Sequence, residues 1–436
     1  MKPSNNYPGF WGFCRHSIPR DGIICHSVLA LTILALSEAA IISADFPPPL
    51  RIPDGIGVNI HFTHAQSGEM EMLADAGFRW VRMDLTWSAT EKTKGQYDFS
   101  SYDHLLYLCD KHHIRLMAIL DYSNPLYDND QSPHSDEGIT AFAKWSMAAV
   151  KHFKGRGVLW EMYNEPNIGF WRPKPDVNAY IQLALAVGKA IKSAEPNELH
   201  CGPALSGTDA AWLEPCFKAG LLQYWDAVSV HPYGDGAPET RAKHYDGLRT
   251  LIARYAPQGK TIPLLSGEWG YTATRVSPET QGNYLARQVL FNLASGIPLN
   301  IWYDWHDDGT DPKEGEHHFG TVAHEYHKDR NPVYDPKPAY LAARTLTHQL
   351  EGFTFSKRLA LTNDSDFFLV FTKGRQTCAA AWTTTTPHSI TVAFASGGAA
   401  ATSCIGKPLP PVAGDKNGLT LELTAAPKYL MPAGGR

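Results

Sequence analysis

The sequence carries little charge, and it has no excess of positive charge. Its 436 residues include 39 Lys and Arg against 44 Asp and Glu, so the formal net charge is −5, and charged residues make up 19% of the chain. Nucleic acids and anionic membranes attract proteins with a basic excess. The composition therefore excludes a nucleic-acid partner and gives no support for binding to an anionic membrane surface.

Cysteine is also scarce. No C-x-x-C motif occurs, which argues against a zinc ribbon or a thioredoxin-type site. Cys14 and Cys25 lie in the first 44 residues, and the other five are Cys109, Cys201, Cys216, Cys378 and Cys404. Sequence spacing would allow the pairs Cys201–Cys216 and Cys378–Cys404, but connectivity cannot be read from sequence, and an odd number leaves at least one free thiol.

Long hydrophobic runs are absent except near the N-terminus. The apolar run Ile23–Leu36 follows several basic residues and precedes the small residues Ser43 and Ala44, an order typical of a secretory signal. The run is shorter than the roughly 20 residues of a membrane-spanning helix. We therefore predict a signal peptide over residues 1–44 and a secreted, periplasmic or extracellular protein, with an uncleaved N-terminal anchor as the alternative.

The rest of the chain alternates short β-branched or apolar runs with amphipathic ones. Hydrophobic residues make up 43% of the chain, which excludes a disordered protein. Eight strands are predicted, at Gly57–Phe62, Arg79–Asp84, Arg115–Asp121, Val158–Tyr163, Leu199–Pro203, Ala227–His231, Thr261–Gly267 and Leu299–Asp304. Predicted helices between and after them include Glu69–Ala76, Asp103–His112, Glu137–Lys154, Val177–Ala194 and Lys337–Leu350.

This alternation predicts an α/β fold in which residues 45–348 form a (β/α)8 TIM barrel. A doubly wound open sheet is the alternative, but no Gly-rich phosphate loop follows the first strand. The composition then changes, and residues 349–436 contain short strand-like runs such as Asp366–Thr372, Thr377–Thr383 and Ser389–Phe394. They predict a small C-terminal antiparallel β-sandwich domain, to which Phe46–Pro53 adds an edge strand.

Two of the predicted barrel strands end on a glutamate. Strand four ends at Glu165, which is followed by Pro166, and strand seven ends at Glu268. The C-terminal ends of the strands line the active site of a (β/α)8 barrel. Two carboxyl groups facing each other there are what glycoside hydrolysis requires, one as the acid and one facing the anomeric carbon.

The sequence Asn164-Glu165-Pro166 at the end of strand four, with Glu268 ending strand seven, resembles the retaining β-glycosidases of clan GH-A, and most closely family 39 or family 5. The resemblance covers residues 55–348, and the terminal β domain is similar to those attached in family 39. It implies that Glu165 is the acid/base and Glu268 the nucleophile. Asn164 would then bind the sugar 2-OH.

The same resemblance implies roles for residues on other strands. Arg82 at the end of strand two would hydrogen-bond Glu268 and favour its ionised form, Tyr233 would donate to the nucleophile, and His231 would line the subsite. Among aromatic residues, Trp302 or Trp305 would stack under the sugar ring. Further candidates for substrate contact are His61 and Trp87. For Asp84 and Asp121, which also end strands, we expect loop capping or a supporting ion pair.

No metal site is predicted. The loop Asp304–Gly309 resembles the opening of a calcium loop, but its third position is His306 and its twelfth is Gly315, where a bidentate Glu is required. His324-Glu-Tyr-His327 is one residue too short for the zinc motif H-E-x-x-H. The proposed chemistry also needs no cofactor.

The sequence therefore predicts a secreted retaining β-glycoside hydrolase that acts on an oligo- or polysaccharide by double displacement. A transglycosylase using the same site, a non-catalytic carbohydrate-binding barrel and an adhesive protein working through its β domain are the alternatives. Sugar, linkage and oligomeric state stay open. Exo or endo action depends on loops without readable motifs, such as 122–137 and 306–332.

Overall fold

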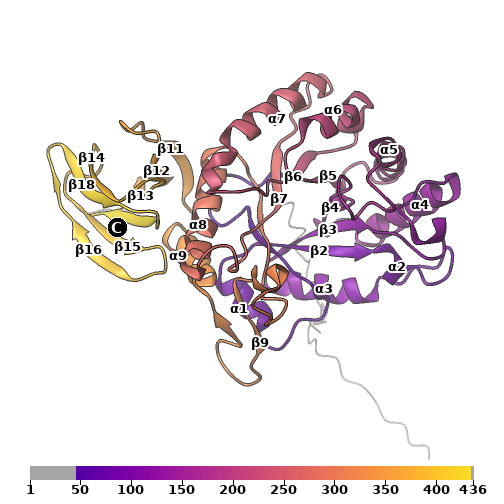
Figure 1. Ribbon diagram of the computed structural model, residues 1–436, viewed down its shortest axis with the longest axis horizontal. Coiled ribbons are helices and arrows are strands. Elements are labelled where there is room, and N and C mark those ends of the chain that lie inside the picture. The colour runs from indigo at the N-terminus through magenta and orange to yellow at the C-terminus, as the bar shows by residue number, and fades with distance from the viewer. Residues whose placement is uncertain (1–45, 434–436) are drawn as a thin grey trace, which may run out of the picture. The chain divides into compact units, whose positions relative to one another are not determined.

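The computed structural model describes residues 46–433, and its centre is a closed barrel of eight parallel strands surrounded by helices (Figure 1). The strands pair in chain order, and β1 closes on β8. They are β1 (Ile56–Asn59), β2 (Trp80–Thr86), β3 (Arg115–Asp121), β4 (Leu159–Met162), β5 (Leu199–Ser206), β6 (Ala227–His231), β7 (Leu264–Trp269) and β8 (Asn300–Trp302). The predicted (β/α)8 barrel is confirmed.

The helices begin where the sequence offers a cap. Ser135 accepts a hydrogen bond from the amide of Gly138 (3.0 Å) and so starts α4, while Asp176 caps α5 in the same way. Such side chains satisfy amide groups that have no partner inside the helix. The helices are α1 (Glu69–Asp75), α2 (Trp87–Thr90), α3 (Ser100–Lys111), α4 (Asp136–His152), α5 (Val177–Ala194), α6 (Ala210–Lys218), α7 (Ala242–Tyr255), α8 (Pro278–Ala294) and α9 (Pro338–Gln349).

The two ends of the barrel interior differ in polarity. Near the N-terminal ends of the strands, Trp80, Met117 and Leu159 belong to a buried apolar cluster. The guanidinium of Arg115 lies 4.0 Å from the centre of the Trp80 ring at this end. Polar and charged side chains gather instead toward the C-terminal ends of the strands. The apolar layer stabilises the barrel, and the other end is free to carry chemistry.

Beyond α9 the chain forms antiparallel sheets, which confirms the predicted C-terminal β-sandwich (Figure 1). One sheet has the order β11-β12-β13-β19-β15-β16 and the other β14-β18-β17. Their bounds are β11 (Thr354–Arg358), β12 (Asp366–Lys373), β13 (Gln376–Thr383), β14 (His388–Val392), β15 (Ala399–Ser403), β16 (Pro408–Val412), β17 (Gly414–Asp415), β18 (Gly418–Leu423) and β19 (Lys428–Pro432). A separate hairpin, β9 (Val322–Tyr326) and β10 (Tyr334–Pro336), precedes α9.

The lead-in segment makes a smaller contribution than a full edge strand. Arg51 forms an isolated antiparallel bridge with Thr354, and the amide of Phe355 donates to the carbonyl of Leu50 (2.9 Å). These bonds join the start of the described chain to the first strand of the sandwich.

The five cysteines of the described chain are all buried, and all have free thiols. The spacing-compatible pairs 201–216 and 378–404 are therefore not formed. The predicted signal peptide, residues 1–44, lies outside the described residues. Within residues 46–433, no helix has the length and apolar character needed to cross a bilayer.

A buried ion pair of the barrel accepts a hydrogen bond from the sandwich. Arg287 on α8 contacts Glu239, which lies just before α7, with 2.8 Å and 2.6 Å between guanidinium nitrogens and carboxylate oxygens. The indole N–H of Trp382 on β13 donates to the same carboxylate (2.7 Å). A charged acceptor buried at this junction is thus held by donors from both parts of the chain.

We predict that Trp382→Phe lowers the free energy of unfolding more than Trp225→Phe does. Both indoles are fully buried, so each change removes the same volume, but within residues 46–433 the Trp225 N–H has no acceptor. The difference between the variants should be roughly 1.5–3 kcal/mol, the contribution of a hydrogen bond to a charged group. Urea unfolding measures it, and equal losses would show that the Glu239 contact does not stabilise the junction.

Candidate active site

A cavity of about 670 Å3 opens at the C-terminal ends of the barrel strands. Glu165, three residues beyond the end of β4, and Glu268 on β7 both line it. Of the other predicted site residues, His61, Arg82, Asn164 and Tyr233 also line the cavity. Residues that are far apart in the sequence therefore lie together at the C-terminal end of the barrel, the end at which the active site was expected.

Arg82 lies at the centre of the site and is fully buried. Its guanidinium donates to Glu161 (2.7 Å), to Glu268 (2.5 Å) and to the side-chain oxygens of Asn59 (3.1 Å) and Asn164 (2.8 Å). Burial lowers the pKa of Arg82, but the charges of Glu161 and Glu268 outweigh this effect and raise it above its ordinary value. The arginine is therefore a permanent cation that fixes groups from three strands.

Glu165 is positioned by an unusual backbone. Its φ is 43° and that of Tyr163 is 63°, both in the left-handed region that side chains other than glycine disfavour. The amide of Glu165 donates to the carbonyl of Ala204 at the end of β5 (2.9 Å), which holds this conformation. Strained residues of this kind cluster at active sites, where the surrounding structure enforces them.

His231 on β6 lies behind Glu165 and is fully buried, so the expectation that it lines the cavity is wrong. Arg82 donates to its Nε2 (3.3 Å), so the ring proton must be on Nδ1, from which it is donated to Glu165 (2.9 Å). Burial raises the pKa of Glu165, but the hydrogen bond from His231 and the positive charges nearby outweigh it and lower the pKa below its ordinary value.

Glu268 accepts a hydrogen bond on each carboxylate oxygen. Arg82 donates to one, and the phenol of Tyr233 donates to the other (2.8 Å). Burial and the charges of Glu268 and Glu165 raise the pKa of Tyr233 well above its ordinary value, so the phenol keeps the proton that it donates. The neighbouring Gly267 leaves room for Ser229 and Glu161, because a Cβ there would lie 2.1 Å from the hydroxyl oxygen of Ser229 and 2.9 Å from a carboxylate oxygen of Glu161.

His61, Asp304 and Asp308 form a group whose ligand atoms lie close enough to hold a metal ion. Its hydrogen bonds oppose that role. The amide of Asn59 faces His61 Nε2 (3.0 Å) while its oxygen accepts from Arg82, so Nδ1 carries the ring proton and faces Asp308 (3.2 Å). Burial lowers the pKa of His61, but the hydrogen bond to Asp308 and the negative charges of Asp308, Asp84 and Glu268 together outweigh it and raise the pKa, so Nδ1 is protonated in either form.

The three predicted tryptophans do not line the cavity, and their expected contact with a sugar ring is corrected. Trp302 is 2% exposed and Trp305 is 1% exposed, and the Trp305 N–H donates to Glu69 (2.9 Å) behind the barrel end. Trp87 stacks on Tyr127, with ring centres 4.8 Å apart. Indoles buried in the core have no face to offer a substrate.

Other aromatic residues, which the sequence did not single out, line the cavity instead of the three tryptophans. Tyr303, one residue after β8, lines the cavity, as do Tyr122 and Phe170 from the loops after β3 and β4. Asp84 also lines the cavity, whereas Asp121 is fully buried. Aromatic residues at strand ends were the available signal, but nothing in the sequence separated Tyr303 from its neighbour Trp302.

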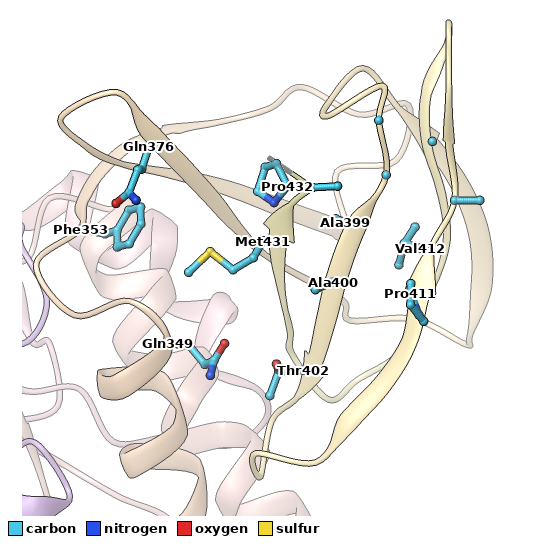
Figure 2. A pocket seen from close by; sticks show the side chains of 15 residues that line it. Gln349, Phe353, Gln376, Ala399, Ala400, Thr402, Pro411, Val412, Met431 and Pro432 are labelled. Atoms are coloured by element: carbon cyan, nitrogen blue, oxygen red, sulfur yellow. The ribbon is translucent and has the colours of Figure 1, made fainter. Parts of the chain in front are cut away.

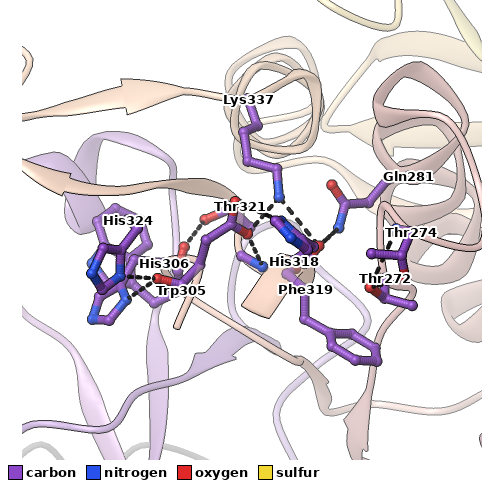
Figure 3. Close-up of polar contacts among 12 residues, drawn as sticks. Thr272, Thr274, Gln281, Trp305, His306, His318, Phe319, Thr321, His324 and Lys337 are labelled. Atoms are coloured by element: carbon purple, nitrogen blue, oxygen red, sulfur yellow. Dashed lines mark hydrogen bonds and ion pairs between the residues drawn. The ribbon is translucent and has the colours of Figure 1, made fainter. Parts of the chain in front are cut away.

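The loop after β8 brings a fourth carboxyl group, Glu316, to the cavity. Burial, with Glu268 and Asp308 nearby, raises the pKa of Glu316. Figure 3 shows how the loop is held: Lys337 and Gln281 both donate to the carbonyl of His318 (3.3 Å and 2.9 Å). Lys337 also donates to the carboxylate of Asp307 (2.6 Å). The predicted role of this loop in shaping the cleft fits its position.

A larger cavity of about 1140 Å3 lies elsewhere, in the C-terminal sheets and next to the end of α9 (Figure 2). Among residues 46–433, its lining includes Phe353, Met431 and Pro432 but no Asp, Glu, His, Lys, Arg or Cys. These lining residues offer no acid–base chemistry, because none of them is titratable. The smaller cavity at the barrel end is therefore the candidate active site.

A closed (β/α)8 barrel with glutamates at the ends of strands four and seven, held by a strand-two arginine, defines a glycoside hydrolase of clan GH-A. Residues 56–309 match the family model Cellulase (glycosyl hydrolase family 5), and the chain belongs to that family.

Known proteins of related families resemble this chain. A β-xylosidase of Geobacillus stearothermophilus is 33% identical over 119 residues, which cover 24% of this chain and 23% of that protein. A family 39 glycoside hydrolase of the gut symbiont Bacteroides cellulosilyticus WH2 matches with a TM-score of 0.75 and 25% identity, over 88% of this chain and 81% of its own. A family 39 β-xylosidase of Caulobacter crescentus has the same fold (TM-score 0.64, 16% identity, 87% and 96% covered).

The negative charge of Glu161 is buried in the barrel beside Arg82. We predict that Glu161→Gln lowers the free energy of unfolding by roughly 3 kcal/mol, because removing one partner of a buried ion pair leaves the other charge unpaired. The side chain is fully buried, pairs with Arg82 and accepts from Ser229 (2.5 Å). Glu137→Gln is the control, because its pair with Lys94 is exposed and should contribute under about 1 kcal/mol. Denaturant unfolding of both variants measures the contrast, and similar losses would contradict it.

Proposed function

We propose that this protein is a retaining β-glycoside hydrolase in which Glu268 is the nucleophile and Glu165 the acid/base. The proposal is carried by one observation: a carboxylate oxygen of Glu165 lies within 4.8 Å of one of Glu268. Retaining enzymes place these groups about 5–5.5 Å apart, whereas inverting enzymes leave about 6.5–9.5 Å for a water molecule. The close approach of one oxygen from each carboxylate favours the retaining arrangement, in which a carboxylate attacks directly.

In the first step Glu268 attacks the anomeric carbon, and the bond from that carbon to the leaving oxygen breaks. Glu165 gives its proton to that oxygen, so the aglycone leaves as an alcohol and the sugar is held as an ester of Glu268. Tyr233 and Arg82 hold Glu268 for this attack. Asn164 lines the cavity and is fixed by Arg82, and its amide, which donates one hydrogen to Tyr122, has a second hydrogen for the sugar 2-OH.

In the second step Glu165, now a carboxylate, removes a proton from water, and the water oxygen attacks the anomeric carbon. The ester bond breaks, Glu268 regains its electron pair, and the sugar leaves with its configuration retained. His231 supports this step, because its hydrogen bond favours the ionised form of Glu165 that acts as base. Tyr303 provides an aromatic ring for the sugar.

The substrates to examine first are β-linked xylosides and glucosides. Two of the similar proteins are named β-xylosidases, and the family is described as cellulase. The cavity also suits a neutral sugar, because its carboxyl groups, from Glu165, Glu268, Asp84 and Glu316, outnumber its two arginines, Arg82 and Arg275, and would repel an acidic sugar.

We expect Glu268→Gln to abolish hydrolysis of aryl β-glycosides and Glu165→Gln to reduce kcat by roughly 10²–10⁴-fold, the usual contribution of a general acid–base. Stopped assays with aryl β-xylosides and β-glucosides measure this, with Glu71→Gln, an exposed glutamate of α1, as the control.

Azide distinguishes the two roles. With Glu165→Ala, azide should replace water and give a β-glycosyl azide, whereas with Glu268→Ala it should give the α-anomer. Near-full turnover by Glu268→Gln would sink the assignment, and sugar transfer to an added alcohol in preference to water would identify a transglycosylase.

The pH profile tests the contact between His231 and Glu165. Replacing His231 with Phe removes the hydrogen bond that lowers the pKa of Glu165, so that pKa should rise. The acid form then persists to higher pH, and the alkaline limb of kcat/KM should move upward. His231→Gln keeps an amide donor and should shift the limb less; an unchanged or downward-shifted limb in His231→Phe would refute the contact's role.

A further inference from the structure

A second cavity, of about 430 Å3, adjoins the catalytic one. The two share Tyr122 and Phe170 as a common wall. We propose that this second cavity binds a further sugar unit of the substrate, so that the enzyme acts on oligosaccharides through at least two subsites. The inference rests on the proposed glycoside hydrolase function and names the substrate class of the same site.

The shared wall has the chemistry that sugars need. The rings of Tyr122 and Phe170 are stacked, with centres 5.6 Å apart and planes at 21°, and Phe170 is 45% exposed. Apolar C–H faces of a sugar pack on such rings, while hydroxyl groups bind polar neighbours. An exposed aromatic pair between two adjoining cavities can contact the sugar on either side of it.

Tyr122 also connects the second cavity to the catalytic residues. The amide of Asn164 donates to its hydroxyl oxygen (2.7 Å), and the oxygen of Asn164 accepts from Arg82. The Tyr122 ring is further held edge-on against Tyr163 (5.7 Å, 89°). A sugar that packs on Tyr122 would therefore sit in a fixed relation to the residue proposed to bind the 2-OH.

Polar groups line the rest of the second cavity. Asp130 accepts from the hydroxyl of Ser123 (2.8 Å), and its other oxygen lies 3.4 Å from Arg172. A guanidinium has five N–H donors. Within residues 46–433, Asp130 is the one partner of the Arg172 side chain, so donors stay available for sugar hydroxyls.

The loop that carries these groups is held in one conformation. Asp128, Asn129 and Asp130 all have left-handed φ values, of 49°, 52° and 59°. The Asp128 carboxylate accepts from the amide of His134 (3.0 Å), and a Cβ at Gly138 would lie 1.8 Å from it. Three consecutive strained residues persist only where the structure enforces them, which occurs often at ligand clamps.

The experiment compares substrates of different length. For each variant, kcat/KM for β-1,4-xylotriose or cellotriose is divided by kcat/KM for the aryl β-xyloside or β-glucoside. We expect Arg172→Ala to lower this ratio roughly tenfold, the effect of one hydrogen bond from a charged donor. Ser88→Phe, which fills the second cavity, should lower the ratio in the same direction. Arg156→Ala is the control, because it precedes β4 at the opposite end of the barrel.

Aryl glycosides of xylobiose and cellobiose locate the subsite. If Arg172→Ala lowers kcat/KM for these aryl disaccharides, the second sugar binds on the glycone side of the cleaved bond. If it lowers kcat/KM for the free trisaccharide alone, the second sugar binds on the aglycone side. Ratios equal to that of the wild type in both variants would overturn the proposal.

Binding separates this proposal from the proposed function. Calorimetry with xylotriose and cellotriose can compare Glu268→Gln with the double variant Glu268→Gln/Arg172→Ala. Roughly tenfold weaker binding by the double variant would support the subsite even if no hydrolysis is found. Hydrolysis by the wild type together with equal trisaccharide binding by the two variants would overturn the subsite and leave the catalytic assignment intact.

Discussion

The buried guanidinium of Arg82 is the interaction on which the active end of the barrel depends. A cation removed from water costs several kcal/mol unless charge and hydrogen bonds compensate it. Glu161 on β4 and Glu268 on β7 supply the charge. One of these two carboxylates, Glu268, is the proposed nucleophile. The ion pair that offsets the cost of burying Arg82 therefore also fixes the position of the reacting carboxylate, so the stability of the barrel and the geometry of the active site depend on the same contact.

The same cation sets where protons sit around it. An arginine can only donate, so each group facing it must accept. His231 accepts on Nε2 and therefore directs a proton at Glu165, and Asn59 accepts on its oxygen and therefore directs its amide at His61. The orientation of both histidines thus follows from one residue of β2, which no pattern in the sequence could reveal.

Much of the fold was predictable, because parallel strands buried on both faces read as short apolar runs. The bounds of β3 and β6 agree with prediction to the residue, and the fold places Glu165 and Glu268 together because both follow such runs. The sandwich was predicted with less detail, since β15 and β16 are rich in Ala and Pro and lack a clear alternation of apolar and polar residues.

The aromatic residues show where prediction from sequence ends. In β8 and beyond it, neighbouring residues point to opposite sides, so a displacement of one residue exchanges a buried ring for a cavity-lining one. Trp302 and Tyr303 differ in this way. Glu161 was missed because its partner Arg82 lies on another strand, and only the closed barrel reveals that a charge within an apolar run is balanced.

The strands and the loops carry different parts of the function. Strands β2, β6 and β7 carry Arg82, His231 and Glu268, whereas the loops after β3 and β4 form the wall shared by the two cavities. Ser132 joins these loops, because its hydroxyl contacts Tyr163 (2.6 Å) and accepts from the amide of Arg172 (2.9 Å). A wall anchored in this way is formed before substrate arrives, as in most small-molecule sites. The length of substrate accepted can therefore change through loop side chains such as Arg172 without moving Glu165, whose position depends on β5 and β6 instead.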